Sequence, residues 1–171
     1  MNISQRATEF KRIFLFQVGI RGVFKGYRTD PKTKKQVKIQ TTEEIDFDVE
    51  AHLSGELSQG FKPADNGNWC FADVDQLGIK PAEFCEELWH VDNKAIPFRS
   101  ISGGWHAFKI FPEIKSKKFL IEEQEQLERK LSKKFKVDVD SGLPKHNRWV
   151  NTPFFGNERL PYDSRGNPIS W

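Results

Sequence analysis

The feature that most constrains the fold is the apolar run from Trp69 to Asp75, which ends in two aspartates, Asp73 and Asp75, one residue apart. In a β-strand alternate side chains point to the same face, so we expect these two carboxylates to lie side by side. Adjacent carboxylates repel each other unless a cation lies between them, and Mg²⁺ and Mn²⁺ prefer oxygen ligands of this kind. A polar turn after the strand is the simpler interpretation, because Asp-x-Asp often occurs by chance.

The length and composition indicate one soluble domain. A chain of 171 residues can bury a sizeable core, and its net charge of +3 is too small to prove a polyanionic partner. Cys70 and Cys85 have no disulfide or zinc spacing, so we expect reduced core residues. Since no run approaches the roughly 20 apolar residues of a membrane span and no signal-peptide core begins the chain, we expect a cytoplasmic protein without a membrane partner.

The residue pattern predicts an α/β (α+β) domain, with helices and strands mixed along the chain. The expected order is a helix and a strand within 7–28, a basic hairpin tip (Lys32, Lys34, Lys35, Lys38), a helix from Thr41 to Leu53, a strand over 69–75, a helix over 80–90, two strands within 95–111, a helix over 116–134, a strand over 135–140 and an extended segment over 146–153. The basic tip fits a solvated turn as well as a nucleic-acid contact. The irregular tail after Phe154 raises the expectation that the domain was cut from a longer protein.

A second group of polar residues surrounds Gly103-Gly104, the strongest hairpin signal in the chain. The group consists of Arg99, Ser100, Ser102 and His106. An arginine, hydroxyls, an imidazole and glycine amides that a ligand can approach are what a triphosphate needs for charge-assisted hydrogen bonds. A plain hairpin does not require these residues together, so we favour phosphate binding. A third carboxylate, Asp138 or Asp140, follows on the polar face of the strand predicted over 135–140.

These motifs stand in an order that resembles the archaeo-eukaryotic primase superfamily, and most of all the primase-polymerases of phages, plasmids and TOTE-type conflict systems. The matching pieces are His52-Leu-Ser-Gly55, Asp73-x-Asp75, Arg99-Ser-Ile-Ser-Gly103, Ser102-Gly-Gly-x-His106, and Asp140 followed by Arg148 and Pro153. The match covers roughly residues 10–160, and the glycine loop is one residue shorter than in the TOTE-type pattern. We expect the lone His52 itself to be structural.

The resemblance implies a two-part catalytic core: an N-terminal subregion (1–65), an RRM-like mixed or antiparallel sheet flanked by helices (66–160) and an irregular tail (161–171). It implies a DNA primase or primase-polymerase that joins NTPs or dNTPs on a single-stranded DNA template and primer. By this resemblance Asp73, Asp75 and Asp140 would hold two Mg²⁺ or Mn²⁺ ions, and His106 would contact the nucleotide's phosphates. The other triphosphate contacts would be Arg99, Ser100, Ser102, Gly103, Gly104 and Arg148. The chain has no helicase P-loop, so a helicase would be a separate domain or partner.

Other interpretations stay open at this point. A catalytically silent module that binds nucleotide or primer-template is one, and a metal-dependent nuclease with three aspartates is another. A rolling-circle nuclease would need a His-x-His pair, whereas His106 stands alone. The residues do not distinguish priming from extension, dNTP from NTP, or Asp138 from Asp140 as the third ligand.

Overall fold

The structure is a computed structural model that describes residues 1–14, 21–29, 31–32, 36–43, 47–61, 66–75, 78–100, 103–136, 150–151 and 153–170. Its helices and strands are mixed along the chain, which confirms the predicted α+β class. They are α1 (Ile3–Phe14), β1 (Arg21–Thr29), β2 (Gln36–Glu43), α2 (Val49–Ser54), β3 (Gln59–Phe61), β4 (Asn66–Val74), α3 (Pro81–Val91), β5 (Ala95–Arg99), β6 (Trp105–Ser116), α4 (Lys117–Phe135) and β7 (Val150–Asn151).

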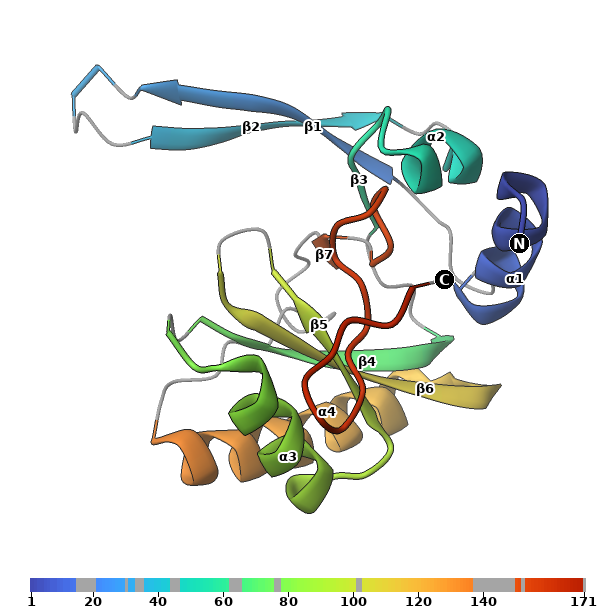
Figure 1. Cartoon of the computed structure of the whole chain (residues 1–171). Coiled ribbons are helices and arrows are strands. Elements are labelled where there is room, and N and C mark those ends of the chain that lie inside the picture. Colours follow the sequence, from blue (N-terminus) through green and yellow to red (C-terminus); the bar gives the residue numbers. More distant parts are fainter. Residues whose placement is uncertain are drawn as a thin grey trace.

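The first sheet has the strand order β2-β1-β3-β7. Its long pair, β1 and β2, runs antiparallel from Arg21–Glu43 at the base to Thr29–Gln36 near the tip. Figure 1 shows this pair as a two-stranded ribbon that reaches away from the rest of the molecule. The exposed Lys32 lies in the turn between the strands, as the predicted hairpin tip requires.

The helix predicted from Thr41 is wrong at its start. Thr41 and Thr42 belong to β2, where they pair with Val23 and Gly22 of β1. Threonine is β-branched and suits a strand better than a helix, and the pairing with β1 decides its state. The helix α2 begins only at Val49, after Asp48, whose side chain accepts a hydrogen bond from the Ala51 backbone N–H at 3.0 Å.

The second sheet has the antiparallel order β4-β6-β5. The predicted strand before Asp75, the helix that follows it and the strand pair around Gly103-Gly104 are all confirmed. Pro81 occupies the first turn of α3, where a missing N–H has no cost. Pro97 lies in β5, an edge strand of this sheet, and edges are where strands tolerate proline.

Helices cover both faces of the second sheet. Because successive side chains of a strand point to opposite faces, the sheet contributes to two separate hydrophobic cores. Figure 1 shows α3 and α4 on one side of the sheet and α1 and α2 on the other. The α3/α4 core contains Ala72, Val74, Phe84, Leu88, Trp105, Ala107, Leu127 and Leu131. The opposite core is rich in aromatic rings and contains Phe10, Phe14, Leu53, Trp69, Phe71, Phe98, Phe108 and Phe154. Those rings are therefore packed inside the protein and do not form an exposed stacking surface for bases.

The strand predicted from Phe135 is wrong at that residue, because Phe135 ends α4. Its ring stacks on Phe84 of α3 at a centroid distance of 5.2 Å, so a contact between helices extends α4 by one residue. Lys136 then adopts a left-handed conformation and ends the helix. Residues 137–149, which include Asp138, Asp140 and Arg148, lie outside the described residues.

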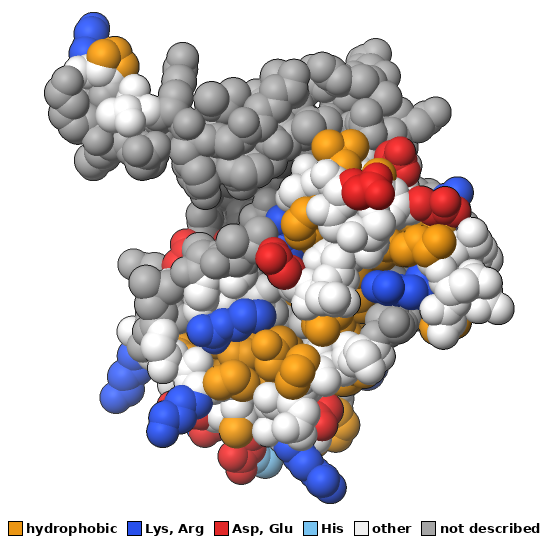
Figure 2. Space-filling model, turned by 45° about the horizontal axis from the view of Figure 1, so that its top comes forward, with side chains coloured by type: hydrophobic (Ala, Val, Ile, Leu, Met, Phe, Trp, Pro, Cys, Tyr) orange, Lys and Arg blue, Asp and Glu red, His pale blue; other side chains and the backbone are white. Residues whose placement is uncertain are grey.

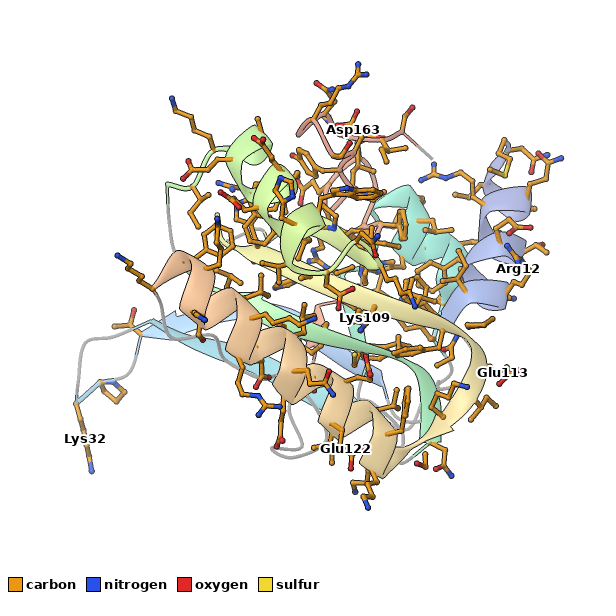
Figure 3. The ribbon with its side chains drawn as sticks, turned by 90° about the horizontal axis from the view of Figure 1, so that it is seen from below. Arg12, Lys32, Lys109, Glu113, Glu122 and Asp163 are labelled. Carbon is orange, nitrogen blue, oxygen red and sulfur yellow. The ribbon has the colours of Figure 1, made fainter. Side chains whose placement is uncertain are left out.

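A buried lysine joins α4 to the second sheet. Nζ of Lys109 on β6 donates hydrogen bonds to Asp92, at 3.0 Å, and to Glu123 of α4. Burial alone would lower the pKa of this ammonium group, but the hydrogen bonds to Glu123 and Asp92 outweigh it and raise the pKa. Figure 3 shows Lys109 in the interior and Lys32 far out at the end of the ribbon.

The C-terminal segment returns to both sheets. β7 pairs with β3 in the first sheet, Phe154 enters the aromatic core, and Pro161 forms a bridge with Phe98 of β5. Apart from β7 and isolated bridges, the described tail is irregular, as predicted. Figure 2 shows positive and negative side chains interspersed over the face in view. None of the helices described is long and apolar enough to cross a membrane.

Candidate functional site

Asp73 and His106 are direct cross-strand partners on β4 and β6. Oδ1 of Asp73 lies 3.3 Å from Nε2 of His106. The contact does not have hydrogen-bond geometry, so the buried Oδ1 atom has no hydrogen-bond donor among the described residues. A buried carboxylate oxygen without a donor is costly, and this cost marks Asp73 as the central residue of the candidate site.

The aromatic core holds the imidazole in place. His106 is 5% exposed, and its ring meets Phe71 edge-on at a centroid distance of 5.8 Å and Phe108 at 6.3 Å. Trp69, Phe71 and Asp73 are every second residue of β4, so their side chains share one face of the sheet. On this face the Asp73 carboxylate follows the two aromatic rings. The site therefore lies where the face opposite α3 and α4 changes from apolar to polar.

A divalent cation fits the donor set at this edge. Asp73 supplies the buried oxygen described above, and Asp75 is an exposed carboxylate immediately after β4. Such oxygens suit Mg²⁺ or Mn²⁺. The third predicted ligand, Asp138 or Asp140, lies outside the described residues. Within the part of the chain that the structure describes, no three His, Cys, Asp or Glu side chains come together as a metal cluster.

The glycine pair between β5 and β6 packs on the end of β4. The turn is closed by hydrogen bonds of 3.0 Å from the N–H of Ser100 to Gly104 O and from the N–H of Gly103 to Ser100 O. A Cβ at Gly104 would lie 2.7 Å from the carbonyl oxygen of Val74, so this position has no room for a side chain. The sequence predicted that the glycines let a ligand approach, whereas Gly104 lets the hairpin approach the strand that carries Asp73.

Arg99 faces away from His106. It pairs with Trp105 across β5 and β6, and its guanidinium lies 4.5 Å from the centroid of the Trp105 ring. Its Nη1 donates a hydrogen bond to Ile79 O at 3.3 Å. His106 pairs with Phe98, so Arg99 and His106 occupy adjacent positions on opposite faces of the sheet. The structure thus brings Asp73 and His106 together and directs Arg99 elsewhere.

Arg99 lines a cavity of about 410 Å³ at the end of β5. Other residues that line it are Ser100, Asn157, Glu158, Arg159 and Tyr162. Sequence reasoning did not identify Arg159, because no motif surrounds it and its burial depends on distant residues. A larger, mostly apolar cavity of about 430 Å³ lies beside α3 and the tail, and none of the predicted site residues that the structure describes lines it.

His52 makes contacts that suit the structural role expected of it. It is fully buried; its Nδ1 accepts a hydrogen bond from the Gln59 N–H at 3.4 Å, and its Nε2 lies 3.0 Å from Pro153 O. The neighbouring Gly55 ends α2 at φ +86° and touches the backbone of Gly156. The His-Leu-Ser-Gly segment therefore anchors the C-terminal tail.

Of the remaining predicted site residues, the structure describes some and leaves others outside its described ranges. Lys32 lies at the end of the ribbon that reaches away from the rest of the molecule, whereas Lys34, Lys35 and Ser102 lie outside the described residues. The backbone of Lys38 belongs to β2. Burial raises the pKa of Cys70 to about 12 and that of Cys85 to about 11, so both thiols stay protonated and inert at neutral pH.

Comparisons with known proteins do not identify a family. No protein-family model matches the chain, and no curated protein matches it closely enough to count as a relative. The function must therefore be inferred from the geometry of the site.

Proposed function

We propose that the protein is a template-dependent nucleotidyltransferase, a DNA primase or primase-polymerase that forms phosphodiester bonds from nucleoside triphosphates. The observation that carries the proposal is the contact of 3.3 Å between Asp73 and His106. These residues belong to the first acidic motif and the histidine motif of the primase resemblance, and α3 and β5 separate them in the sequence. Two short motifs that matched by chance would not be expected to lie next to each other on adjacent strands.

The order of elements also supports the proposal. From β4 to α4 the chain runs strand, helix, strand, strand, helix, and the third of these strands lies between the first two. An RRM-like sheet has this arrangement, in the split βαβ pattern. The N-terminal sheet with its basic ribbon would be the second part of a two-part core, and Lys32, Lys34, Lys35 and Lys38 would contact the template there.

Asp73, Asp75 and a third carboxylate, Asp140 or Asp138, would hold two divalent ions. Bound Mg²⁺ or Mn²⁺ would supply activation of the attacking hydroxyl and charge neutralisation of the departing pyrophosphate. The buried Oδ1 of Asp73, which lacks a hydrogen-bond donor among the described residues, is the protein atom that gains most from such a ligand.

In the proposed reaction a hydroxyl oxygen of the primer, or of the first nucleotide, attacks the α-phosphorus of the incoming nucleotide. The bond from that phosphorus to the bridging oxygen breaks, pyrophosphate leaves with the bond's electrons, and the hydroxyl proton passes to solvent. The role of His106 is to donate an N–H to a phosphate oxygen. Because Phe71 and Phe108 fix its ring, the imidazole needs little reorganisation to do so.

The test is nucleotide incorporation on primed and unprimed single-stranded DNA, resolved on gels. Labelled dNTPs and NTPs would be supplied with Mg²⁺ or Mn²⁺. We expect products with the wild type, and loss to below about 1% in Asp73→Ala/Asp75→Ala and to about 10% or less in His106→Ala. Glu113→Ala is the matched control, because this exposed carboxylate (Figure 3) lies near the end of β6 whereas His106 lies near its start. Its removal should leave synthesis unchanged.

The unprimed lanes decide whether the protein starts chains or only extends them. Absence of product under every condition, with nucleotide or template binding intact, would overturn the catalytic proposal. It would favour the second candidate, a silent module that binds nucleotide or primer-template.

A further inference from the structure

We propose that Arg159 and Arg99 together form a phosphate subsite in the cavity at the end of β5. The two arginines reach this cavity of about 410 Å³ from different parts of the chain, one from β5 and the other from the tail. The proposal deepens the proposed function and rests on it for the source of the phosphate, which is either a nucleoside triphosphate or the backbone of the nucleic acid.

Both guanidinium groups are held in place by the same kind of contacts. Arg159 lies with its guanidinium 5.0 Å from the centroid of the Phe155 ring, and its Nη2 donates a hydrogen bond of 2.8 Å to Oγ of Ser58. Arg99 is held in the same way by the Trp105 ring and by one carbonyl oxygen. A guanidinium has five N–H donors in a rigid fork that matches phosphate geometry. Two such groups fixed at one cavity are arranged to bind an anion with little loss of side-chain entropy.

The charge around the cavity favours an anion. Arg159 is 6% exposed, and among the described residues that line the cavity only Glu158 carries a negative charge. Burial lowers the pKa of Arg159 to about 10, with partial compensation from Glu158. The side chain therefore stays charged at neutral pH, although it has lost most of its water. A phosphate group in the cavity would accept charge-assisted hydrogen bonds from the two guanidinium groups.

The backbone that carries Arg159 is strained. Arg159 has φ +51° and Phe154 has φ +63°, although neither is a glycine. The Phe154 N–H donates a hydrogen bond of 3.0 Å to Arg159 O and thereby closes the loop between them. A left-handed conformation costs a non-glycine residue about 1–2 kcal/mol. Such strain persists where the surrounding structure enforces it, and it is concentrated at functional sites.

The test measures the binding of inorganic tripolyphosphate, of ATP and of a single-stranded oligonucleotide by calorimetry, with Ca²⁺ present to limit turnover. Arg159→Gln should weaken tripolyphosphate binding about tenfold or more, the effect of losing one charge-assisted contact. Arg159→Lys should recover part of the loss. Arg165→Gln is the control, because it removes an exposed arginine of the same tail that does not line this cavity and should change affinity less than twofold.

Arg159 is buried, so its replacement can also disturb folding. Asn157→Asp avoids this, because it adds a negative charge at an exposed residue that lines the cavity and removes no buried group. It should weaken tripolyphosphate binding about fivefold or more. If the subsite binds the phosphates of a nucleotide, the variants should lose affinity for ATP and for tripolyphosphate in parallel. If it binds the nucleic-acid backbone, they should lose more affinity for the oligonucleotide. If Asn157→Asp and a folded Arg159→Gln bind all three probes as the wild type does, the subsite is refuted.

The two proposals fail differently. Wild-type protein that binds tripolyphosphate through Arg159 but synthesises no nucleic acid would refute the polymerase and keep the subsite. An active polymerase whose KM for nucleotide and affinity for DNA are unchanged in both variants would keep the function and refute the subsite.

Discussion

Gly104 is the residue at which the packing of the candidate site can be tested most directly. In Gly104→Ala the new methyl group would lie 2.7 Å from the Val74 carbonyl oxygen and 3.4 Å from Cα of Asp75. To bring the first distance to an ordinary contact of 3.4 Å, the hairpin and β4 must separate by about 0.7 Å. Overpacking of this kind costs about 1–3 kcal/mol. We therefore expect a folded protein with a lower free energy of unfolding.

The same shift changes the geometry of the site. It moves the turn relative to Asp75, and a displacement of about 1 Å can reduce catalysis as much as a hundredfold. Urea unfolding followed by tryptophan fluorescence measures the first effect, and nucleotide incorporation measures the second. For the proposed nucleotidyltransferase we expect kcat/KM to fall about tenfold to a hundredfold. This exceeds what the loss of stability alone would produce in a protein that remains folded.

The matched control is Gly78→Ala. Gly78 has φ +94°, but beyond its chain neighbours no atom of the described residues lies within 4 Å of its Cβ position. This variant therefore has backbone strain without a clash among the described residues. It should lose about 1–2 kcal/mol of stability and keep its activity. A Gly104→Ala protein that unfolds at the wild-type urea concentration and synthesises normally would refute the close packing of the hairpin on β4.

Two further predictions concern buried polar groups. Lys109→Met should lose about 3–5 kcal/mol at pH 7 in urea unfolding, because Glu123 loses the cation that it binds and Asp92 keeps only the longer contact of 3.8 Å with Lys130. The exposed Lys118→Met should stay within about 0.5 kcal/mol. The raised pKa of Lys109 means that, on the alkaline side, its contribution is kept up to pH 10.5 and is lost as the pH rises through the raised value. The difference in stability between wild type and variant should therefore stay constant from pH 7 to about pH 10 and narrow above it. His52→Ala should lower stability by roughly 2–4 kcal/mol, since both ring nitrogens contact buried backbone groups. A loss of activity in His52→Ala at an unchanged unfolding midpoint would instead indicate a chemical role.

Elements with a strong local pattern were predictable from the sequence, and those decided by distant contacts were not. Helix α3 follows from Pro81 and from the spacing of Phe84 and Leu88, which lie within one segment. Thr41 precedes acidic residues as a helix start would, yet its pairing with β1 makes it part of a strand. Phe135 alternates with Val137 as a strand would, yet its contact with Phe84 keeps it in a helix.

The same distinction applies to the candidate site. Asp73 and His106 were each predicted as functional residues. Their contact, however, depends on β4 pairing with β6 and not with β5, which is closer to β4 in the sequence. The requirement for glycine at residue 104 was predicted, but its physical reason was not, because that reason is the carbonyl of Val74. Nothing around Arg159 in the sequence indicates burial, since its partner Ser58 lies far away in the chain.

The return of the tail to both sheets has a consequence for how the protein is made. Ribosomes synthesise the N-terminal part first, so the rings of Phe10, Phe14 and Phe98 emerge before Phe154, which packs against all three. Until residues 150–162 leave the exit tunnel, the first sheet lacks β7 and part of the aromatic core lacks its cover. A nascent chain halted before that point would expose apolar surface of the kind that chaperones bind and that aggregates. The native core is therefore completed only after these residues have left the tunnel.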